Sequence, residues 1–317
     1  MLTQRPMRIH KNLIGYFLVT LLAGCGNGGT PEKIKDTPTS GNICISADDE
    51  YSPLTEAEIS VFEGLYRKTK IRSVYTTEDS AFSLLKNDSV RLIVVGRKLL
   101  ADEETYFNDK KLHPEQVKIG TDALVFIVNN SNPDTLISLD KIKLLFNGKD
   151  SLWKQVDIKS QLNKVSVVFD HENSGNSHYI SQKLLQGNKF PSYCFALHSN
   201  KEVIDYVSKN VNALGIIGAN WISNEYDTSV IRFRKSIKVV AISIKESANP
   251  ADYYKPDPYY MQTDQYPLCR DIFIISREAY TGLGSGFLSF VTSNNGQRIV
   301  YREGLLPSRA VSHNMHF

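Results

Sequence analysis

The chain has 317 residues, of which 41% are hydrophobic and 10% aromatic, with 37 Lys and Arg residues against 34 Asp and Glu residues. This composition is typical of a folded globular protein and argues against a disordered chain, a collagen-like repeat or a coiled coil. The formal charge of +3 comes from Arg5, Arg8 and Lys11, which precede an apolar segment that we expect to be removed, and the rest of the chain is neutral. A chain without net positive charge has little long-range attraction for nucleic acid, so DNA and RNA are not expected partners.

The N-terminal segment predicts export from the cytoplasm. Residues 13–23 are apolar and follow three basic residues. The run is shorter than the roughly 20 residues needed to span a bilayer and fits the apolar region of a secretory signal. It ends in Leu-Ala-Gly-Cys, which resembles the lipobox of bacterial lipoproteins and implies lipidation of Cys25. We expect residues 1–24 to be a signal peptide and residues 25–41, rich in Gly, Pro, Ser and Thr, a flexible tether. The alternative is a soluble secreted protein whose signal ends near a cysteine.

The first part of the folded chain alternates strand-like and helical patterns. Strands are expected at residues 43–47, 71–75 and 90–95. Between them, helices are expected to begin at Ser52 and at Thr76, each with a capping residue and apolar side chains at helical spacing. This βαβαβ order predicts an α/β fold with a parallel sheet flanked by helices.

The same alternation continues toward the C-terminus. Further strands are expected at residues 123–128, 165–169, 214–217, 239–244 and 271–276. Helices are expected after Ser138 and Asn200 as N-caps, through Tyr179 to an end at Gly187, and twice more before Gly304. Two α/β units therefore fit the chain better than one.

Cysteine and histidine positions predict neither a metal site nor a cofactor. Once Cys25 is lipidated, Cys44, Cys194 and Cys269 remain, an odd number for an oxidising compartment. Cys44 is expected to be a buried free thiol, and a bridge between the other two stays possible. The sequence has no pair of His or Cys residues at metal-ligand spacing. It also lacks a nucleophile elbow and a Gly-rich phosphate loop followed by Lys, so an enzyme is not predicted.

Four segments resemble, in the same order, segments of the phosphate-type solute-binding proteins of ABC transporters. The matching segments are IGTDALVFIVNNSNPDTLISLDKIKLLFNGK with its following Trp (119–153), VIDYVSKNVNALGIIGANWI (203–222), YPLCRDIFII (266–275) and NNGQRIVYREGLLP (294–307). The resemblance implies a two-lobed periplasmic-binding-protein fold of the second type, in which each lobe is a mixed or parallel sheet flanked by helices. It places lobe 1 at residues 42–120 plus 240–317 and lobe 2 at residues 121–239. Two crossover segments would join the lobes, with the ligand between them.

The resemblance also implies a ligand site formed by loops from both lobes. The implied ligand-binding residues are Ser46, Asp49, Thr76, Thr77 and Arg97 in lobe 1, and Asp170, Asn173, Ser174, Gly175 and Asn176 in lobe 2. Helices that begin at the cleft would present backbone N–H groups and a dipole that favour an anion. The sequence departs from the family's pattern, because Asp170 or His171 stands where an Arg is expected and Arg97 stands where a carboxylate is expected.

Two interpretations of this departure remain open. Arg97 and Asp170 could hold the same oxyanion with their charges exchanged across the cleft, or Arg97 could form a salt bridge while Asp170 caps a helix. The cluster Asp48-Asp49-Glu50 is unfavourable beside an anion unless a carboxyl is protonated or faces solvent, and we expect Glu50 to lie in a solvated loop. Asp122 is expected to form hydrogen bonds at a crossover rather than to contact the ligand.

The predicted function is that of a lipid-anchored solute receptor on the periplasmic side of a bacterial membrane. The resemblance implies a monomer that binds phosphate or a related oxyanion and delivers it to the permease of an ABC transporter. Contact with the membrane would be through the lipid anchor only. The alternative is a receptor-derived lipoprotein that binds or senses a solute without feeding a transporter.

Overall fold

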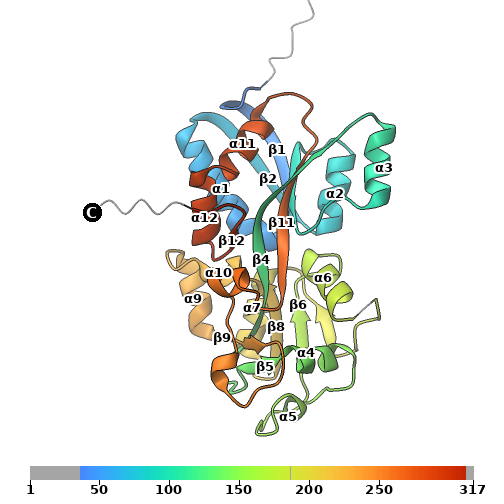
Figure 1. Ribbon diagram of the computed structural model, residues 1–317, viewed down its shortest axis with the longest axis vertical. Coiled ribbons are helices and arrows are strands. Elements are labelled where there is room, and N and C mark those ends of the chain that lie inside the picture. The colour runs from blue at the N-terminus through green and yellow to red at the C-terminus, as the bar shows by residue number, and fades with distance from the viewer. Residues whose placement is uncertain (1–35, 186, 312–317) are drawn as a thin grey trace, which may run out of the picture. The chain divides into compact units, whose positions relative to one another are not determined.

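The computed structural model describes residues 36–185 and 187–311 (Figure 1). The predicted signal peptide, Cys25 and most of the predicted tether lie outside the described residues. Within the described ranges, every helix is too short or too polar to cross a membrane.

The first part of the chain forms the βαβαβ unit predicted from the sequence. Strands β1 (Ser40–Asp48), β2 (Lys68–Thr76) and β3 (Leu92–Val95) are parallel and lie in the order β2-β1-β3. They alternate with η1 (Asp49–Tyr51), α1 (Ser52–Leu65) and α2 (Glu78–Lys86), and α3 (Ala101–Asp109) follows. All four residues of β3 are buried, as an apolar strand covered on both faces should be.

Strand β4 (Glu115–Asn129) joins two halves of one mixed sheet. Its first part pairs antiparallel with β11 (Cys269–Ser276) and β12 (Leu306–Pro307). Its second part pairs antiparallel with β8 (Ala213–Gly218) and β9 (Ile237–Val239). The strand order is β2-β1-β3-β11-β4-β8-β6-β7, and β4 and β11 lie side by side near the centre of Figure 1.

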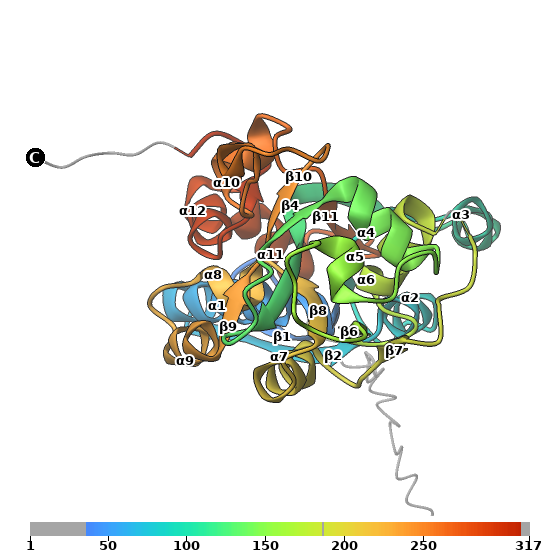
Figure 2. The same cartoon turned by 90° about the horizontal axis from the view of Figure 1, so that it is seen from below.

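The second half of the sheet contains β6 (Ser166–Phe169) and β7 (Cys194–Ala196), which run parallel to each other, and β6 is parallel to β8. The helices after β4 are α4 (Leu139–Phe146), α5 (Trp153–Val156), α6 (Gly175–Lys183), α7 (Asn200–Lys209), α8 (Asn220–Ser223) and α9 (Thr228–Ser236). Figure 2 shows α4 and α5 on one side of β6 and β8, with α7 on the other. A separate ribbon pairs β5 (Leu136–Ser138) with β10 (Ala241–Ser243).

The C-terminal part of the chain returns to the first half of the sheet. Here η2 (Pro250–Asp252) and α10 (Pro258–Gln262) precede β11, and α11 (Leu283–Val291) and α12 (Asn294–Arg302) follow it. One large apolar core extends under both halves, and a smaller one lies beneath α2 and α3. The alternation of strands and helices predicted from the sequence is confirmed as a mixed α/β fold.

Several predicted boundaries are wrong by a residue or more, including the N-cap of α1, which is Tyr51 rather than Ser52, and the end of α6, which is Lys183 rather than Gly187. Thr77, not Thr76, is the N-cap of α2, because its Oγ1 is the one that accepts the Ser80 N–H. Ser199, not Asn200, caps α7 in the same way. The single strand predicted at 239–244 is split, because Val240 N–H donates to Phe126 O while the next N–H donates to Thr135 O.

The cysteines in the described ranges are all free thiols. The possible bridge between Cys194 and Cys269 is absent, since Cys194 lies on edge strand β7 and Cys269 on β11, with other strands between them. Cys44 is free as predicted but only half-buried.

Candidate ligand site at the start of helix α6

A cavity of about 230 Å³ lies where the carboxyl ends of β1 and β2 approach the start of α6. Because β1 and β2 are parallel, the polar residues that follow them meet at the same edge of the sheet. The residues that line the cavity are Asp48, Asp49, Tyr75, Thr76, Thr77, Asp170, His171, Ser174 and His198. Half of the ten site residues implied by the sequence are therefore together here: Asp49, Thr76, Thr77, Asp170 and Ser174.

The start of α6 is organised by hydroxyl and carboxylate groups. Ser174 is its N-cap, and its Oγ accepts the Ser177 N–H at 3.2 Å. The same Oγ lies 2.7 Å from Asp170 Oδ1, so Asp170 orients the capping residue and is not itself the cap. The next residue, Gly175, donates its backbone N–H to Asp48 Oδ2 at 2.7 Å. A carboxylate from β1 thus occupies the position at this helix where an anion would be stabilised.

The other implied site residues have different contacts. Ser46 is buried and donates its hydroxyl to Val74 O at 2.8 Å, which fastens β1 to β2. Asn173 is exposed, and its backbone N–H donates to His171 Nδ1. Asn176 is buried and accepts from Arg270 Nη2 at 2.9 Å. None of the three lines the cavity.

Arg97 does not line the cavity either, because two carboxylates and an aromatic ring hold its guanidinium. Both of its terminal nitrogens contact Glu103, at 2.7 and 3.1 Å, and its Nε lies 3.3 Å from Glu78 Oε2. The guanidinium also lies 3.7 Å from the ring centroid of Phe82. This geometry matches the salt-bridge interpretation of Arg97 rather than the exchange of charges. Among the described residues that line the cavity there is neither Arg nor Lys.

The central buried cation, Arg270, is not among the site residues predicted from the sequence. Its side chain is 4% exposed, and Nη2 contacts Glu50 Oε1 at 2.7 Å and Asp122 Oδ2 at 3.1 Å. The sequence did contain one signal, since Arg270 interrupts an apolar run, and in the structure it is the register partner of Asp122. The expectation that Glu50 is solvated is therefore wrong, because Arg270 supplies the counter-charge that allows its burial. Asp122 forms hydrogen bonds where β4 passes from one half to the other, as expected, and also accepts the Ala219 N–H.

Burial favours the protonated form of the carboxyl groups around the cavity. Loss of water raises the pKa of Asp48 well above its usual range, and the nearby Asp170 and Glu78 carboxylates raise it further. Burial also raises the pKa of Asp170 and of Asp49. A proton on one of these groups would convert it into a hydrogen-bond donor and remove its repulsion of an anion.

A second link connects α2 to α6. His178 Nδ1 lies 3.0 Å from Glu78 Oε2, and this hydrogen bond raises the pKa of the imidazole. His178, Gly175 and Asn176 thus join α6 to α2, β1 and β11, respectively.

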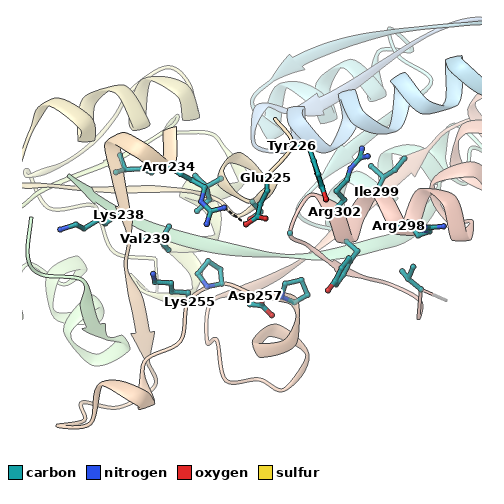
Figure 3. Close-up of a pocket in the computed structure, with 18 of the residues that line it drawn as sticks. Glu225, Tyr226, Arg234, Lys238, Val239, Lys255, Asp257, Arg298, Ile299 and Arg302 are labelled. Carbon is teal, nitrogen blue, oxygen red and sulfur yellow. Dashed lines mark hydrogen bonds and ion pairs between the residues drawn. The ribbon is translucent and has the colours of Figure 1, made fainter. Parts of the chain in front are cut away.

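A larger cavity, of about 1150 Å³, lies elsewhere (Figure 3). Its basic residues are Arg234, Lys238, Lys255, Arg298 and Arg302, and Arg234 pairs with Glu225 at 3.1 Å. None of the site residues implied by the sequence lines it. Within the described ranges, no group of His, Cys, Asp and Glu side chains could hold a metal ion.

Comparison with known proteins gives the same family as the sequence motifs. The phosphate-binding protein PstS of Pseudomonas aeruginosa strain PAO1 is 23% identical over 292 residues, which are 87% of this chain and 86% of that protein. A protein of Clostridium perfringens solved with bound phosphate aligns with a TM-score of 0.70 and 20% identity, over 85% of this chain and all of that chain. An ABC-type phosphate transport receptor of Vibrio cholerae aligns with a TM-score of 0.60 and 18% identity, over 84% of this chain and all of that chain. Residues 35–295 match the family model of a PBP superfamily domain, and the chain therefore belongs to that superfamily.

Proposed function

We propose that the chain is an extracytoplasmic solute-binding protein that holds phosphate or a related oxyanion in the cavity at the start of α6. The observation that carries this proposal is the meeting of the α6 N-terminus with the hydroxyl residues Thr76 and Thr77 around one cavity. Backbone N–H groups at a helix start, the helix dipole and nearby hydroxyls are the groups that stabilise an oxyanion. The proposal that the protein delivers its ligand to an ABC transporter is supported by its similarity to the relatives named above. No contact described in this chain bears on it.

The carboxylates of the cavity favour an oxyanion that carries a proton. Asp48, Asp49 and Asp170 line the cavity, and each would repel a fully ionised sulfate. Monohydrogen phosphate can instead donate its proton to a carboxylate oxygen in a charge-assisted hydrogen bond. The proposal therefore includes selection of phosphate over sulfate.

We also propose that the cavity lies between two lobes, residues 42–120 plus 240–317 and residues 121–239. Support comes from β4, which pairs with β11 in one half of the sheet and with β8 in the other. Lipid anchoring through Cys25 is supported by the sequence alone. Cys25→Ser should release the protein from the membrane fraction or leave its signal uncleaved, whereas a processed variant that stays in that fraction would contradict anchoring.

One observation favours the second candidate, a receptor that binds or senses a different solute without feeding a transporter. The described lining of the cavity contains three aspartates but neither Arg nor Lys. That charge balance suits a neutral or cationic solute better than a dianion.

Calorimetry of the purified protein against phosphate, arsenate, sulfate and molybdate tests the proposed function. Phosphate and arsenate should bind, because both carry a proton near neutral pH, and sulfate should bind more weakly or not at all. Absence of heat with all four anions would contradict the oxyanion proposal and leave the second candidate.

A further inference from the structure

The starts of α2 and α6 meet at the cavity, although the two helices pack on different halves of the sheet. Helix α2 packs on β1 and β3, whereas α6 packs on β8. Thr77, the N-cap of α2, lines the cavity, and so does Ser174, the N-cap of α6. A small ligand that bonds to both helix starts at once needs them held at one separation before it binds.

One side-chain contact joins the two helices directly beside these caps. His178 lies four residues after Ser174, and Glu78 follows Thr77. His178 Nδ1 lies 3.0 Å from Glu78 Oε2, and its Nε2 lies 3.6 Å from Asp79 Oδ2. The side chain of Glu78 is 2% exposed and that of His178 33%. The imidazole thus ties α6 to α2 about one turn away from the cavity.

Glu78 is fixed as a hydrogen-bond acceptor by its own half of the sheet. Its Oε1 accepts the Gly96 N–H at 2.9 Å, and its Oε2 lies 3.3 Å from Arg97 Nε. Burial alone would raise the pKa of Glu78, but the His178 hydrogen bond and the Arg97 charge outweigh burial and lower it. Glu78 is therefore ionised, and the imidazole is the partner whose charge can change.

We propose that His178 is a positioning residue for the ligand, because its contact with Glu78 holds the start of α6 where both helices can bind one oxyanion. This inference rests on the proposed function. The buried contacts of Gly175 and Asn176 also hold α6, so loss of the imidazole should loosen the helix rather than unfold the protein. Fewer molecules would then have the cavity assembled, and the apparent affinity would fall by the same fraction.

The contact should weaken as pH rises. The charged groups that face His178 are Glu78 and Asp79 from α2 and Arg97 from the segment after β3. The Glu78 hydrogen bond raises the pKa of the imidazole above its ordinary value of 6.5, while burial and Arg97 oppose that rise. An imidazolium pairs with Glu78 through charge and a hydrogen bond, whereas a neutral imidazole keeps only the hydrogen bond. The contribution is therefore complete below pH 6.5 and is lost as pH rises through the higher pKa of the folded state.

The test compares the parent with His178→Ala by calorimetric titration with phosphate at pH 6 and pH 8.5. At pH 6, His178→Ala should bind phosphate about three- to tenfold more weakly than the parent, the effect of losing a partly exposed ion pair. At pH 8.5 the difference should be about twofold or less. Because variant and parent are compared at the same pH, the ionisation of phosphate itself cancels. His113→Ala, which removes an exposed histidine between α3 and β4, is the control and should match the parent at both pH values.

His178→Gln separates positioning from charge. Its amide N–H can donate to Glu78, but the side chain neither titrates nor carries a charge. It should match the parent at pH 8.5 and lie between the parent and His178→Ala at pH 6. Equal affinities of the Gln and Ala variants at both pH values would assign the effect to charge alone and overturn the inference. Should His178→Ala fail to fold, the parent's advantage over His178→Gln should disappear between pH 6 and pH 8.5, and a constant ratio would overturn it.

Hydrogen exchange of residues 171–180 without phosphate gives a second measurement. At pH 6 this segment should exchange faster in His178→Ala than in the parent, and His178→Gln should restore part of the protection. Equal exchange in all three proteins would overturn the inference, as would a loss of affinity in His178→Ala that is the same at both pH values. A parent that binds no phosphate would contradict the proposed function. Faster exchange in His178→Ala would then still support the positioning of α6 by His178.

Discussion

Two arginines, the half-buried Arg97 and the buried Arg270, pair with four carboxylates that do not line the cavity. Arg97 holds Glu78 and Glu103, and Arg270 holds Glu50 and Asp122. Removing the partner of a buried carboxylate exposes the full penalty of burying that charge. The carboxylates that remain available to a ligand are therefore those that line the cavity. The sequence alone could not separate them from the carboxylates that pair with Arg97 and Arg270.

The first prediction concerns Arg97. Arg97→Ala should leave phosphate affinity within about twofold of the parent, because Arg97 does not line the cavity. Stability should fall by about 1–3 kcal/mol, because the buried Glu103 loses a bidentate partner. Lys98→Ala, at the exposed neighbouring position, is the control and should change neither quantity. Calorimetry and urea denaturation measure the two effects. A tenfold loss of phosphate affinity in Arg97→Ala would restore the exchanged-charge hypothesis.

At the scale of elements, local patterns predicted strands and helices well and their ends less well. The apolar run that became β3 and the Ser138 cap of α4 depend on neighbouring residues, which the sequence displays directly. The split between β9 and β10 depends on which distant strand accepts each N–H, and that information is absent from the local pattern. The Thr76–Thr77 pair offers two equivalent hydroxyls, so a shift of one residue could not be resolved.

Helix α1 contains a buried acid that should make stability depend on pH. Glu58 is 2% exposed, and neither carboxyl oxygen has a hydrogen-bond partner among the described residues. Burial, together with the nearby Glu303, raises the pKa of Glu58 to about 9. The folded state therefore holds a proton that the unfolded state releases above its ordinary pKa near 4.5. This stabilising contribution is complete below that value and is lost as pH rises toward 9.

The second prediction follows from this loss of stability as pH rises. Glu58→Gln imitates the protonated acid, so its stability relative to the parent should increase between pH 5 and pH 8.5. The increase should be at most about 1.4 kcal/mol per pH unit, which corresponds to one proton. Glu56→Gln, on the exposed face of the same helix, is the matched control and should show no such trend. Parallel pH curves for Glu58→Gln and the parent in thermal unfolding would contradict the assignment.

At the scale of the whole described chain, α6 is one of the elements that link the two halves of the sheet through polar contacts. Its residues Gly175, Asn176 and His178 bond to Asp48, Arg270 and Glu78, from β1, β11 and α2. The family resemblance named loops of which half of the implied residues line one cavity, because the order of the motifs fixes which strands end at the same edge. It could not show that a carboxylate of β1 bonds to α6, since that contact joins positions 127 residues apart.

The last prediction tests whether Arg270 is the counter-charge that connects these halves. Arg270→Met should lower the free energy of unfolding by about 3–5 kcal/mol at pH 7.5, because the buried Glu50 and Asp122 carboxylates lose their cation. Burial already raises the pKa of both groups, and without Arg270 they should rise further. Since groups with a raised folded-state pKa destabilise the fold increasingly as pH rises, the loss should be smaller at pH 5 than at pH 7.5.

Arg234→Met is the control, because its ion pair with Glu225 has side chains 49% and 75% exposed. Exposed pairs contribute at most about 1 kcal/mol, so urea denaturation should show little change for this variant at either pH. A loss for Arg270→Met that is the same at both pH values, or no greater than that of Arg234→Met, would show that the buried carboxyls do not depend on Arg270.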